Sequence, residues 1–293
     1  MRAQSALFLS CFLLFSPLSS ARNPVDSAVY KTILFEITSP QSLHRSYLFG
    51  THHAFGKPFF DSLTKANQAL QNSDVLIKEN RNVPGHLAED IINRRNAKTK
   101  WSKFLNKTDL AFINDLFSSS PTDFQKMTPA EMQAFLNRYF KSQVCLSKNP
   151  SDTSLSLDDY IGLNAEQQNM KLIGLETTEE QIALLNKDVA GMPVKVHKRR
   201  LSAVINHIRT QNTNNCGETD WYARMQIDYH FEEACKNTLI LSDRNNKWMS
   251  TIEKQIEANN CFIVVGLSHL MYSCGLVNQL REKGYSLKAI PVK

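Results

Sequence analysis

The segment CFIVVGLSHL (Cys261–Leu270) places five apolar residues before Gly266 and a histidine three positions after that glycine. A short apolar run closed by a turn signal is typical of a buried strand, and glycine permits a tight exit from it. The sequence therefore predicts a strand, a turn and then a helix that continues to Lys283. His269 is expected just beyond the carboxyl end of that strand.

The same pattern occurs near the start of the chain. YLFGTHH (Tyr47–His53) is a second β-rich run with Gly-x-x-His at its end. It follows YKTILFEITS (Tyr30–Ser39) after a short polar link, so the two runs predict a β-hairpin. His53 is expected to face the same crevice as the later histidine. Its neighbour His52 is expected to face away, because successive side chains of a strand alternate.

The remaining pattern alternates strands with long helical stretches. Further strands are predicted at 74–80, 170–177 and 285–292, and helices at 59–73, 86–148, 155–169, 179–187, 191–211 and 218–257, the last broken near 238–242. The predicted fold class is α/β (α+β-like), with a small mixed β-sheet formed from N- and C-terminal strands and surrounded by many helices. We expect a single domain over residues 22–293, with a helical insert or cap at about 84–149.

The amino terminus has the pattern of a cleavable signal peptide over residues 1–21. An uncharged apolar core, Ala6–Leu18, follows Arg2 and precedes the small residues Ser19–Ala21. This core is shorter than the roughly 20 residues that a membrane helix needs. The sequence predicts an exported protein, periplasmic or secreted, with no stable membrane span after signal cleavage.

The charge of the chain bears on its possible partners, and its cysteine content bears on its possible disulfides. The net charge of +6 is mild, and the basic run KVHKRR (Lys195–Arg200) is interpreted as a solvated helix face, so no nucleic-acid partner is expected. An exported protein meets oxidising conditions. Removal of the signal leaves five cysteines, enough for at most two disulfides and one free thiol, with the pairing open: Cys145, Cys216, Cys235, Cys261 and Cys274.

Polar residues follow four of the predicted strands, and strand carboxyl ends are where α/β sheets bind ligands. If these ends converge, they bring near one another His52, His53, Glu79, Glu176 and His269. Two imidazoles and a carboxylate are a usual set of ligands for a catalytic divalent metal, and a second carboxylate could take a proton from water. Neither G-x-S-x-G nor HExxH is present, so two other hydrolase classes find no support.

Five segments in order resemble the TraB/GumN family, which includes the Tiki metalloproteases: YLFGTHHAF, SDVLIKEN, LIGLETTEEQ, LSDRNNKWMSTIE and CFIVVGLSHLMYSCGLVNQLREKGYSL. The resemblance implies that a divalent metal ion (Mn, Co or Zn) is bound by His53, His269 and Glu79. It implies catalytic roles for Glu79 and Glu176. It also implies that Arg244 and Asn245 bind the substrate, or that the arginine holds a carboxylate ligand.

Two functions from different classes follow from these residues. The first is an exported metal-dependent hydrolase, a peptidase that acts on a peptide or protein substrate. The alternative is a non-catalytic protein that binds and sequesters a peptide, a metal or haem iron. Metal content and product formation distinguish the two.

Overall fold

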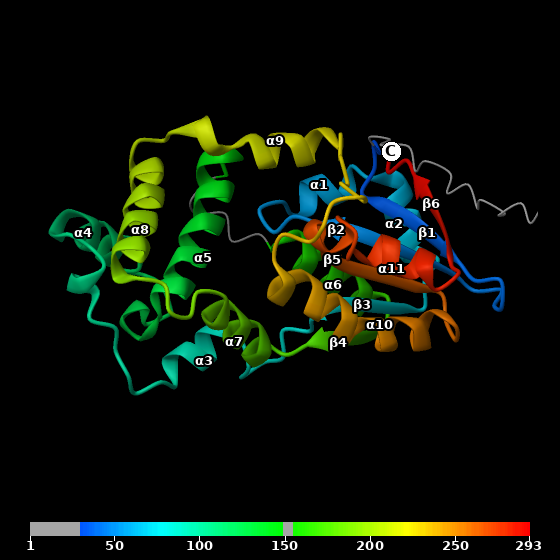
Figure 1. The fold of residues 1–293 in the computed structure, drawn as a ribbon, viewed down its shortest axis with the longest axis horizontal. Helices are drawn as coiled ribbons and strands as arrows, with labels where there is room; N and C mark the ends of the chain where they lie inside the picture. The colour runs from blue at the N-terminus through cyan, green and yellow to red at the C-terminus, as the bar shows by residue number, and fades with distance from the viewer. Residues whose placement is uncertain (1–29, 149–154) are drawn as a thin grey trace, which may run out of the picture.

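A six-stranded mixed sheet forms one half of the molecule in the computed structural model, which describes residues 30–148 and 155–293 (Figure 1). The expected signal segment, residues 1–21, lies outside the described residues. The strand order is β4-β3-β5-β2-β1-β6. The strands are β1 (Leu34–Thr38), β2 (Arg45–Thr51), β3 (Val75–Asn80), β4 (Lys171–Glu176), β5 (Cys261–Gly266) and β6 (Ser286–Ile290). The predicted mixed α/β fold is confirmed.

Strand β5 lies between β2 and β3, and β2, β5, β3 and β4 are all parallel. In β5, the residues from Cys261 to Val265 are at most 1% exposed. Because both faces of this strand are buried, its sequence is a continuous apolar run without alternation. In register, Thr51 lies beside Gly266, and Asn80 lies beside Glu176. The four carboxyl ends therefore meet at one edge of the sheet. The predicted hairpin is also present, because β1 and β2 pair antiparallel.

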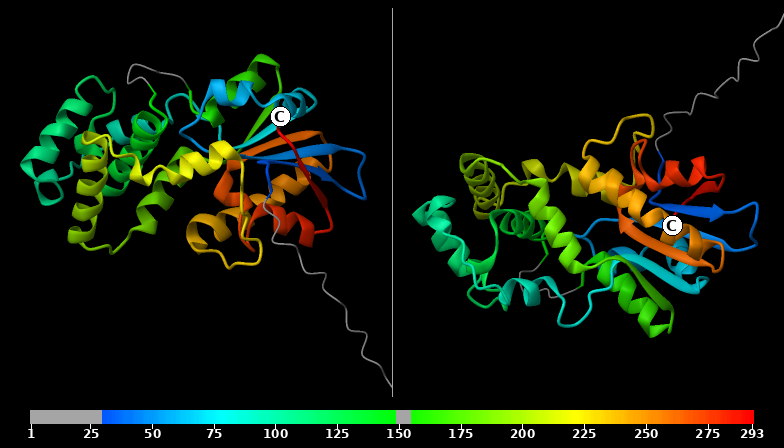
Figure 2. Two further views of the ribbon diagram at one scale, coloured as in Figure 1. Left: turned by 90° about the horizontal axis from the view of Figure 1, so that it is seen from above. Right: turned by 60° about the horizontal axis from the view of Figure 1, so that its bottom comes forward.

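Helices cover both faces of this sheet, as the left view of Figure 2 shows. Three lie on one face and two on the other. The first group is α1 (Lys57–Asp61), α2 (Thr64–Gln71) and α6 (Leu157–Gln167), and the second is α10 (Asp243–Ile256) and α11 (Leu276–Glu282). The predicted helix over 59–73 is divided into α1 and α2 at Ser62 and Leu63.

A second group of helices forms the other half of the molecule and has its own apolar core. Its helices are α3 (Ala88–Asn93), α4 (Lys107–Leu116), α5 (Pro129–Phe140), α7 (Thr178–Asp188), α8 (Val194–Arg209) and α9 (Gly217–Arg224). The buried core residues come from α3, α4, α5, α8 and their connections, whereas Tyr222 of α9 belongs to the core of the sheet. We call this half the helical lobe. Helix α8 comes after β4 in the chain, yet its Leu201 and Ile205 are fully buried in the core that the 84–149 segment builds. The lobe is therefore assembled from two separate stretches of sequence.

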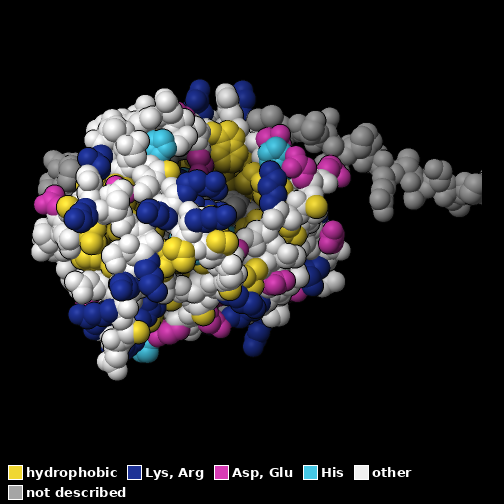
Figure 3. All heavy atoms as spheres, turned by 60° about the vertical axis from the view of Figure 1, so that its left-hand side comes forward, with side chains coloured by type: hydrophobic (Ala, Val, Ile, Leu, Met, Phe, Trp, Pro, Cys, Tyr) yellow, Lys and Arg dark blue, Asp and Glu magenta, His cyan; other side chains and the backbone are white. Residues whose placement is uncertain are grey.

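The basic run on α8 is exposed, as the sequence predicts. Figure 3 views the molecule from the side of the helical lobe and shows Lys and Arg side chains distributed over this face. Several of them lie around a hollow that is bordered by hydrophobic side chains.

Residues 225–237 are not helical, contrary to the prediction. Helix α9 ends at Met225, which has a left-handed backbone with φ of 54°, and the chain then returns to the sheet. Ile227 forms a β-bridge to Tyr30, and the Tyr229 hydroxyl donates to the Thr32 carbonyl at 2.8 Å. Alternate residues Ile227, Tyr229 and Phe231 are buried, so the period here is two, which the helix prediction missed.

The cysteines form two disulfides, Cys145–Cys216 and Cys235–Cys274, and leave Cys261 as a buried thiol. Two bridges are the most that these five cysteines allow, and the structure supplies the pairing that the sequence left open. The first disulfide joins the two stretches of the helical lobe. No helix within 30–148 or 155–293 is long and apolar enough to cross a membrane.

Glu131 connects three parts of the helical lobe. Its carboxylate accepts hydrogen bonds from Arg95 at 2.7 and 2.9 Å, from the Thr128 N–H at 2.9 Å and from the Asn186 amide at 2.9 Å. Burial favours the neutral form of Glu131, but these donors outweigh it and hold the pKa of the carboxyl below its usual range. Glu131 therefore stabilises the lobe as an anion.

We expect Glu131→Gln to destabilise the protein by about 2 kcal/mol at pH 7, because the buried donors lose a charged acceptor. A carboxyl whose pKa is lowered by folding stabilises the protein above its unfolded pKa, and this contribution is lost as pH falls through the folded pKa. The difference in free energy of unfolding between wild type and variant should therefore shrink as the pH falls below 4.5, the ordinary pKa of a glutamate side chain. Urea unfolding at pH 7 and pH 4 measures both differences.

The exposed Glu232→Gln is the matched control and should leave stability unchanged at both pH values. An equal loss at pH 7 and pH 4 for Glu131→Gln would contradict the proposed anionic role.

Candidate functional site

Arg244, in the first turn of α10, lies at the centre of the site. Its guanidinium donates to both oxygens of Glu176, with Nε at 3.0 and 3.1 Å and Nη2 at 2.7 Å, and Nη2 also donates to Glu79 Oε2 at 2.7 Å. The Trp248 ring lies 4.7 Å below the guanidinium carbon. The Glu176 side chain is 0% exposed and that of Arg244 is 12% exposed. Two carboxylates from adjacent strands thus share one buried cation.

His269 is held in one tautomer by Asn245. It lies in a short 3-10 turn, η6 (Leu267–Leu270), directly after β5. The Asn245 amide donates to the carbonyls of His269 and Cys274 at 3.1 and 2.9 Å, so its oxygen is left to accept from His269 Nδ1 at 2.7 Å. The Nε2 lone pair then accepts from Arg244 Nη1 at 2.9 Å.

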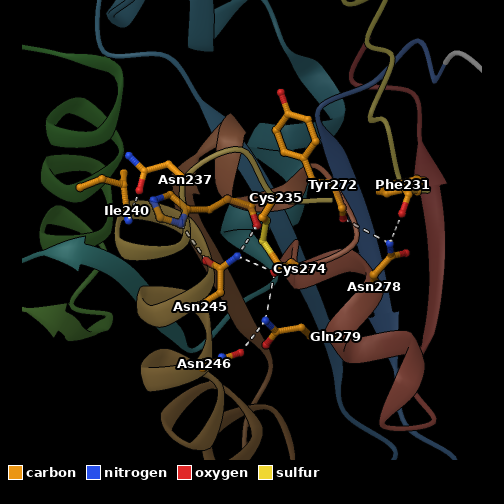
Figure 4. The surroundings of a disulfide bond; sticks show 11 residues. Phe231, Cys235, Asn237, Ile240, Asn245, Asn246, Tyr272, Cys274, Asn278 and Gln279 are labelled. Atoms are coloured by element: carbon orange, nitrogen blue, oxygen red, sulfur yellow. Dashed lines mark hydrogen bonds between the residues drawn. A yellow bond between two sulfur atoms is a disulfide. The ribbon is translucent and has the colours of Figure 1, made fainter. Parts of the chain in front are cut away.

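The disulfide Cys235–Cys274 lies next to this network. Figure 4 shows the Asn245 amide reaching Cys274, whose sulfur is bonded to Cys235. The Gln279 amide also donates to the Cys274 carbonyl, at 3.0 Å. The disulfide therefore fixes the carbonyl that orients Asn245, and Asn245 in turn orients His269.

Burial lowers the pKa of His269 to about 4, and the adjacent guanidinium acts in the same direction. The imidazole is therefore neutral near pH 7. Burial opposes ionisation of Glu79, but Arg244, the neighbouring imidazoles and the Gly266 N–H, which donates to Oε1 at 2.7 Å, hold the pKa of that carboxyl below its usual range. The centre thus combines the neutral imidazole of His269 with the ionised carboxylate of Glu79.

His53 has a different partner, Asp158. Its Nδ1 lies 2.6 Å from Asp158 Oδ2, and the Thr51 hydroxyl donates to the other carboxylate oxygen. The charge of Asp158 raises the pKa of His53 to about 9. The His53 side chain is 58% exposed and that of Asp158 is 12% exposed. The imidazole is therefore protonated near pH 7, and Nε2 would have to lose its proton before it could bind a metal ion.

Asp158 is not among the site residues predicted from the sequence. It lies in the first turn of α6 after the N-cap Ser156, where acidic residues are common because they suit the helix dipole. Asp159 is the acid that the Ser156 cap contacts, whereas Asp158 faces the strand ends. The two adjacent acids in DDY were the available signal, but the sequence alone could not show which one faces the site.

His52 lies apart from the Arg244 cluster. Its ring packs against Phe55 and Tyr222 at centroid distances of 5.4 and 5.3 Å. Its Nδ1 accepts from the Ala54 N–H at 3.2 Å, and its Nε2 lies 3.3 Å from Glu218 Oε1. His52 and His53 therefore have different partners, but both line the larger of the two cavities that adjoin the cluster, so His52 does not face away from the crevice as expected.

Two cavities adjoin the cluster. A polar cavity of about 440 Å³ is lined by His53, Glu79 and Arg244 among others. A larger cavity of about 620 Å³, mostly apolar, lies between the helical lobe and the ends of β2 and β5. His53, Ala134, Arg138 and Leu185 line both, so the cavities are neighbours that meet at these residues.

The structure brings five of the six predicted site residues into one hydrogen-bonded network: Glu79, Glu176, Arg244, Asn245 and His269. His53 lines the polar cavity with Glu79 and Arg244. Asn245 is 0% exposed and its amide is fully engaged, so it positions His269. Both oxygens of Glu176 are bound by Arg244, so Glu176 positions the guanidinium.

The histidines suit a metal ion in one important respect. Metal-binding imidazoles usually donate their other ring nitrogen to an oxygen acceptor, and Asp158 and Asn245 provide such acceptors for His53 and His269. Arg244, however, already donates to His269 Nε2. Within the part of the chain that the structure describes, no three or more His, Cys, Asp and Glu side chains are arranged to hold a metal as they stand. An ion at His269 therefore requires the guanidinium to release that nitrogen.

The family model described as the TraB/PrgY/gumN family matches residues 33–289, a span that includes almost all of the sheet and the whole helical lobe. None of the curated proteins matches the chain.

We expect removal of the Cys235–Cys274 disulfide, as a Cys235→Ser/Cys274→Ser double variant, to disturb His269. The Cys274 carbonyl would no longer be fixed, so Asn245 would hold the Nδ1–H tautomer less firmly. ¹⁵N NMR of the imidazoles should show changed His269 signals. The free energy of unfolding should fall by about 2–5 kcal/mol.

Cys145→Ser/Cys216→Ser is the matched control, because it loses a disulfide of the helical lobe instead. It should lose stability but keep the His269 signals. Identical His269 signals in both double variants would show that the disulfide does not position the imidazole.

Proposed function

The chain belongs to the TraB/PrgY/gumN family, and on that premise we propose that it is an exported metal-dependent hydrolase that cleaves peptide bonds. One observation supports this most directly. Two histidines separated by more than 200 residues each have Nδ1 bound to a buried oxygen acceptor at the carboxyl ends of adjacent strands. This orients Nε2 of both rings toward the site that holds Glu79, although Arg244 Nη1 donates to His269 Nε2 in this structure.

In this proposal, His53 and His269 hold the divalent ion through Nε2. When bound, the ion would supply Lewis-acid polarisation of the scissile carbonyl. Arg244 would release His269 and keep its bonds to Glu176, which alone provides three of its contacts.

Glu79 is the residue that takes a proton from the attacking water at a carboxylate oxygen. It lines the polar cavity and its side chain is 14% exposed. Glu176, the other candidate for this role, is fully buried under Arg244. Asn245 and Asp158 are positioning residues, since each acts by holding an imidazole in place.

A second candidate function is supported by the same guanidinium. Arg244 already binds Glu79 and Glu176 and occupies His269 Nε2, so these side chains have hydrogen-bond partners without an ion. This arrangement favours a protein that binds and sequesters a peptide without turnover. Stoichiometric capture of peptides, with no products by mass spectrometry, would select this alternative.

We expect His53→Ala and His269→Ala each to lose bound metal and to reduce peptide cleavage at least about 100-fold, because each removes a ligand. Elemental analysis of protein purified without chelator, followed by a peptide-library assay with Mn, Co and Zn, measures both quantities. His44→Ala, in the hairpin link at the opposite end of the sheet, is the control. Unchanged metal content and activity in both site variants would reject the proposal.

We expect Glu79→Gln to keep the metal and lose turnover by about 100-fold, because an amide cannot accept the proton from water. Metal content and single-turnover cleavage are measured on the same preparation. Loss of metal in this variant would instead identify Glu79 as a ligand, which is the role that the family resemblance implies.

A further inference from the structure

Arg138, on α5, lies where the two cavities meet. It lines both of them, as His53 does. A group bound at this junction therefore has His53 beside it, the polar cluster on one side and the apolar cavity on the other.

Arg138 differs from the other cations that line these cavities. Lys78 pairs with Asp159 at 3.3 Å, Lys141 pairs with Glu218 at 2.5 Å, and Arg244 binds the carboxylates described above. Among residues 30–148 and 155–293, no ion pair or hydrogen bond of the Arg138 side chain is observed. Its guanidinium is exposed to the crevice, and a guanidinium fork matches a carboxylate in two-pronged geometry.

The apolar cavity supplies the second recognition element. Its volume of about 620 Å³ is within the range of ligand pockets, and its lining includes Ile92, Phe117, Met127, Phe135, Trp221 and Met271. Glu89, also in this lining, has no ion-pair partner in the described parts of the chain. Its charge would repel a carboxylate, so the anionic group belongs at the Arg138 end.

We propose that the crevice selects a peptide by its last residue, with the free α-carboxylate bound to Arg138 and a large apolar side chain in the apolar cavity. This inference rests on the proposed function. The peptide bond before that residue then lies beside His53. Hydrolysis breaks its C–N bond, forms a C–O bond from water, and delivers a proton to the leaving amine, so a single apolar amino acid is released.

The test uses probes without a peptide bond, so that binding is measured apart from turnover. 3-Phenylpropanoate carries both the carboxylate and the apolar ring, 3-phenylpropanamide lacks the charge, and propanoate lacks the ring. Calorimetry or ligand-observed NMR gives the dissociation constants for wild type, Arg138→Gln, Ala88→Trp and Arg199→Gln. Ala88 lines only the apolar cavity, and the exposed Arg199 lines neither.

Wild type should bind 3-phenylpropanoate about tenfold more tightly than either other probe, since a charged hydrogen bond or a buried ring each contributes that much. Arg138→Gln should abolish the preference for the acid over the amide. Ala88→Trp should reduce the preference for the ring, and Arg199→Gln should change neither. Equal binding of acid and amide to wild type, an unchanged preference in Arg138→Gln, or no binding of any probe would overturn the inference.

Cleavage of N-acetyl-Ala-Phe and of its C-terminal amide is then measured separately. The expected binding pattern without any cleavage would reject the proposed hydrolase but retain the Arg138 site. Equal cleavage of the acid and the amide would reject the Arg138 site but retain the hydrolase.

Discussion

The guanidinium of Arg244 connects the carboxyl ends of three neighbouring parallel strands. It donates to Glu79 at the end of β3, to Glu176 at the end of β4 and to His269 just after β5. Two carboxylates this close would repel each other without a cation, and a buried ion pair is tolerated only when its hydrogen bonds are well satisfied. Arg244 thus ties the strand ends together, and it acts with Asn245 on the tautomer of His269 and with the Gly266 N–H on the ionised state of Glu79.

Only the parts of the site that have a local sequence signal could be predicted from the sequence. Strand ends are marked by apolar runs that stop at glycine, so the positions of His53 and His269 followed from local pattern. Asp158 did not follow, because an acid in the first turn of a helix looks the same whether it caps the helix or faces a site. The exclusive pairing of Glu176 with Arg244 was also beyond local pattern, since it depends on how α10 packs over β4.

The fold, too, could be predicted only where the sequence pattern is local. The mixed sheet and its hairpin followed from short apolar runs and turn residues, and most helices followed from their period. The segment 225–237 was assigned as helix because its neighbours on both sides are helical. Its alternate burial at Ile227, Tyr229 and Phe231 is created by contact with the sheet, and only the folded chain reveals it. The participation of α8 in the helical lobe is likewise a matter of tertiary packing, not of propensity.

The division of the molecule into two cores has a consequence for how its specificity could change. The groups that form the reactive centre are carried by the sheet and α10, whereas Arg138 and much of the apolar lining are carried by the 84–149 segment and α7. Substitutions in the helical lobe can therefore alter which ligands enter the crevice while the Arg244 network stays intact. The reactive centre and the selectivity of this protein are separable modules, and an exchange of the insert between relatives is a route to a new ligand range with the old chemistry.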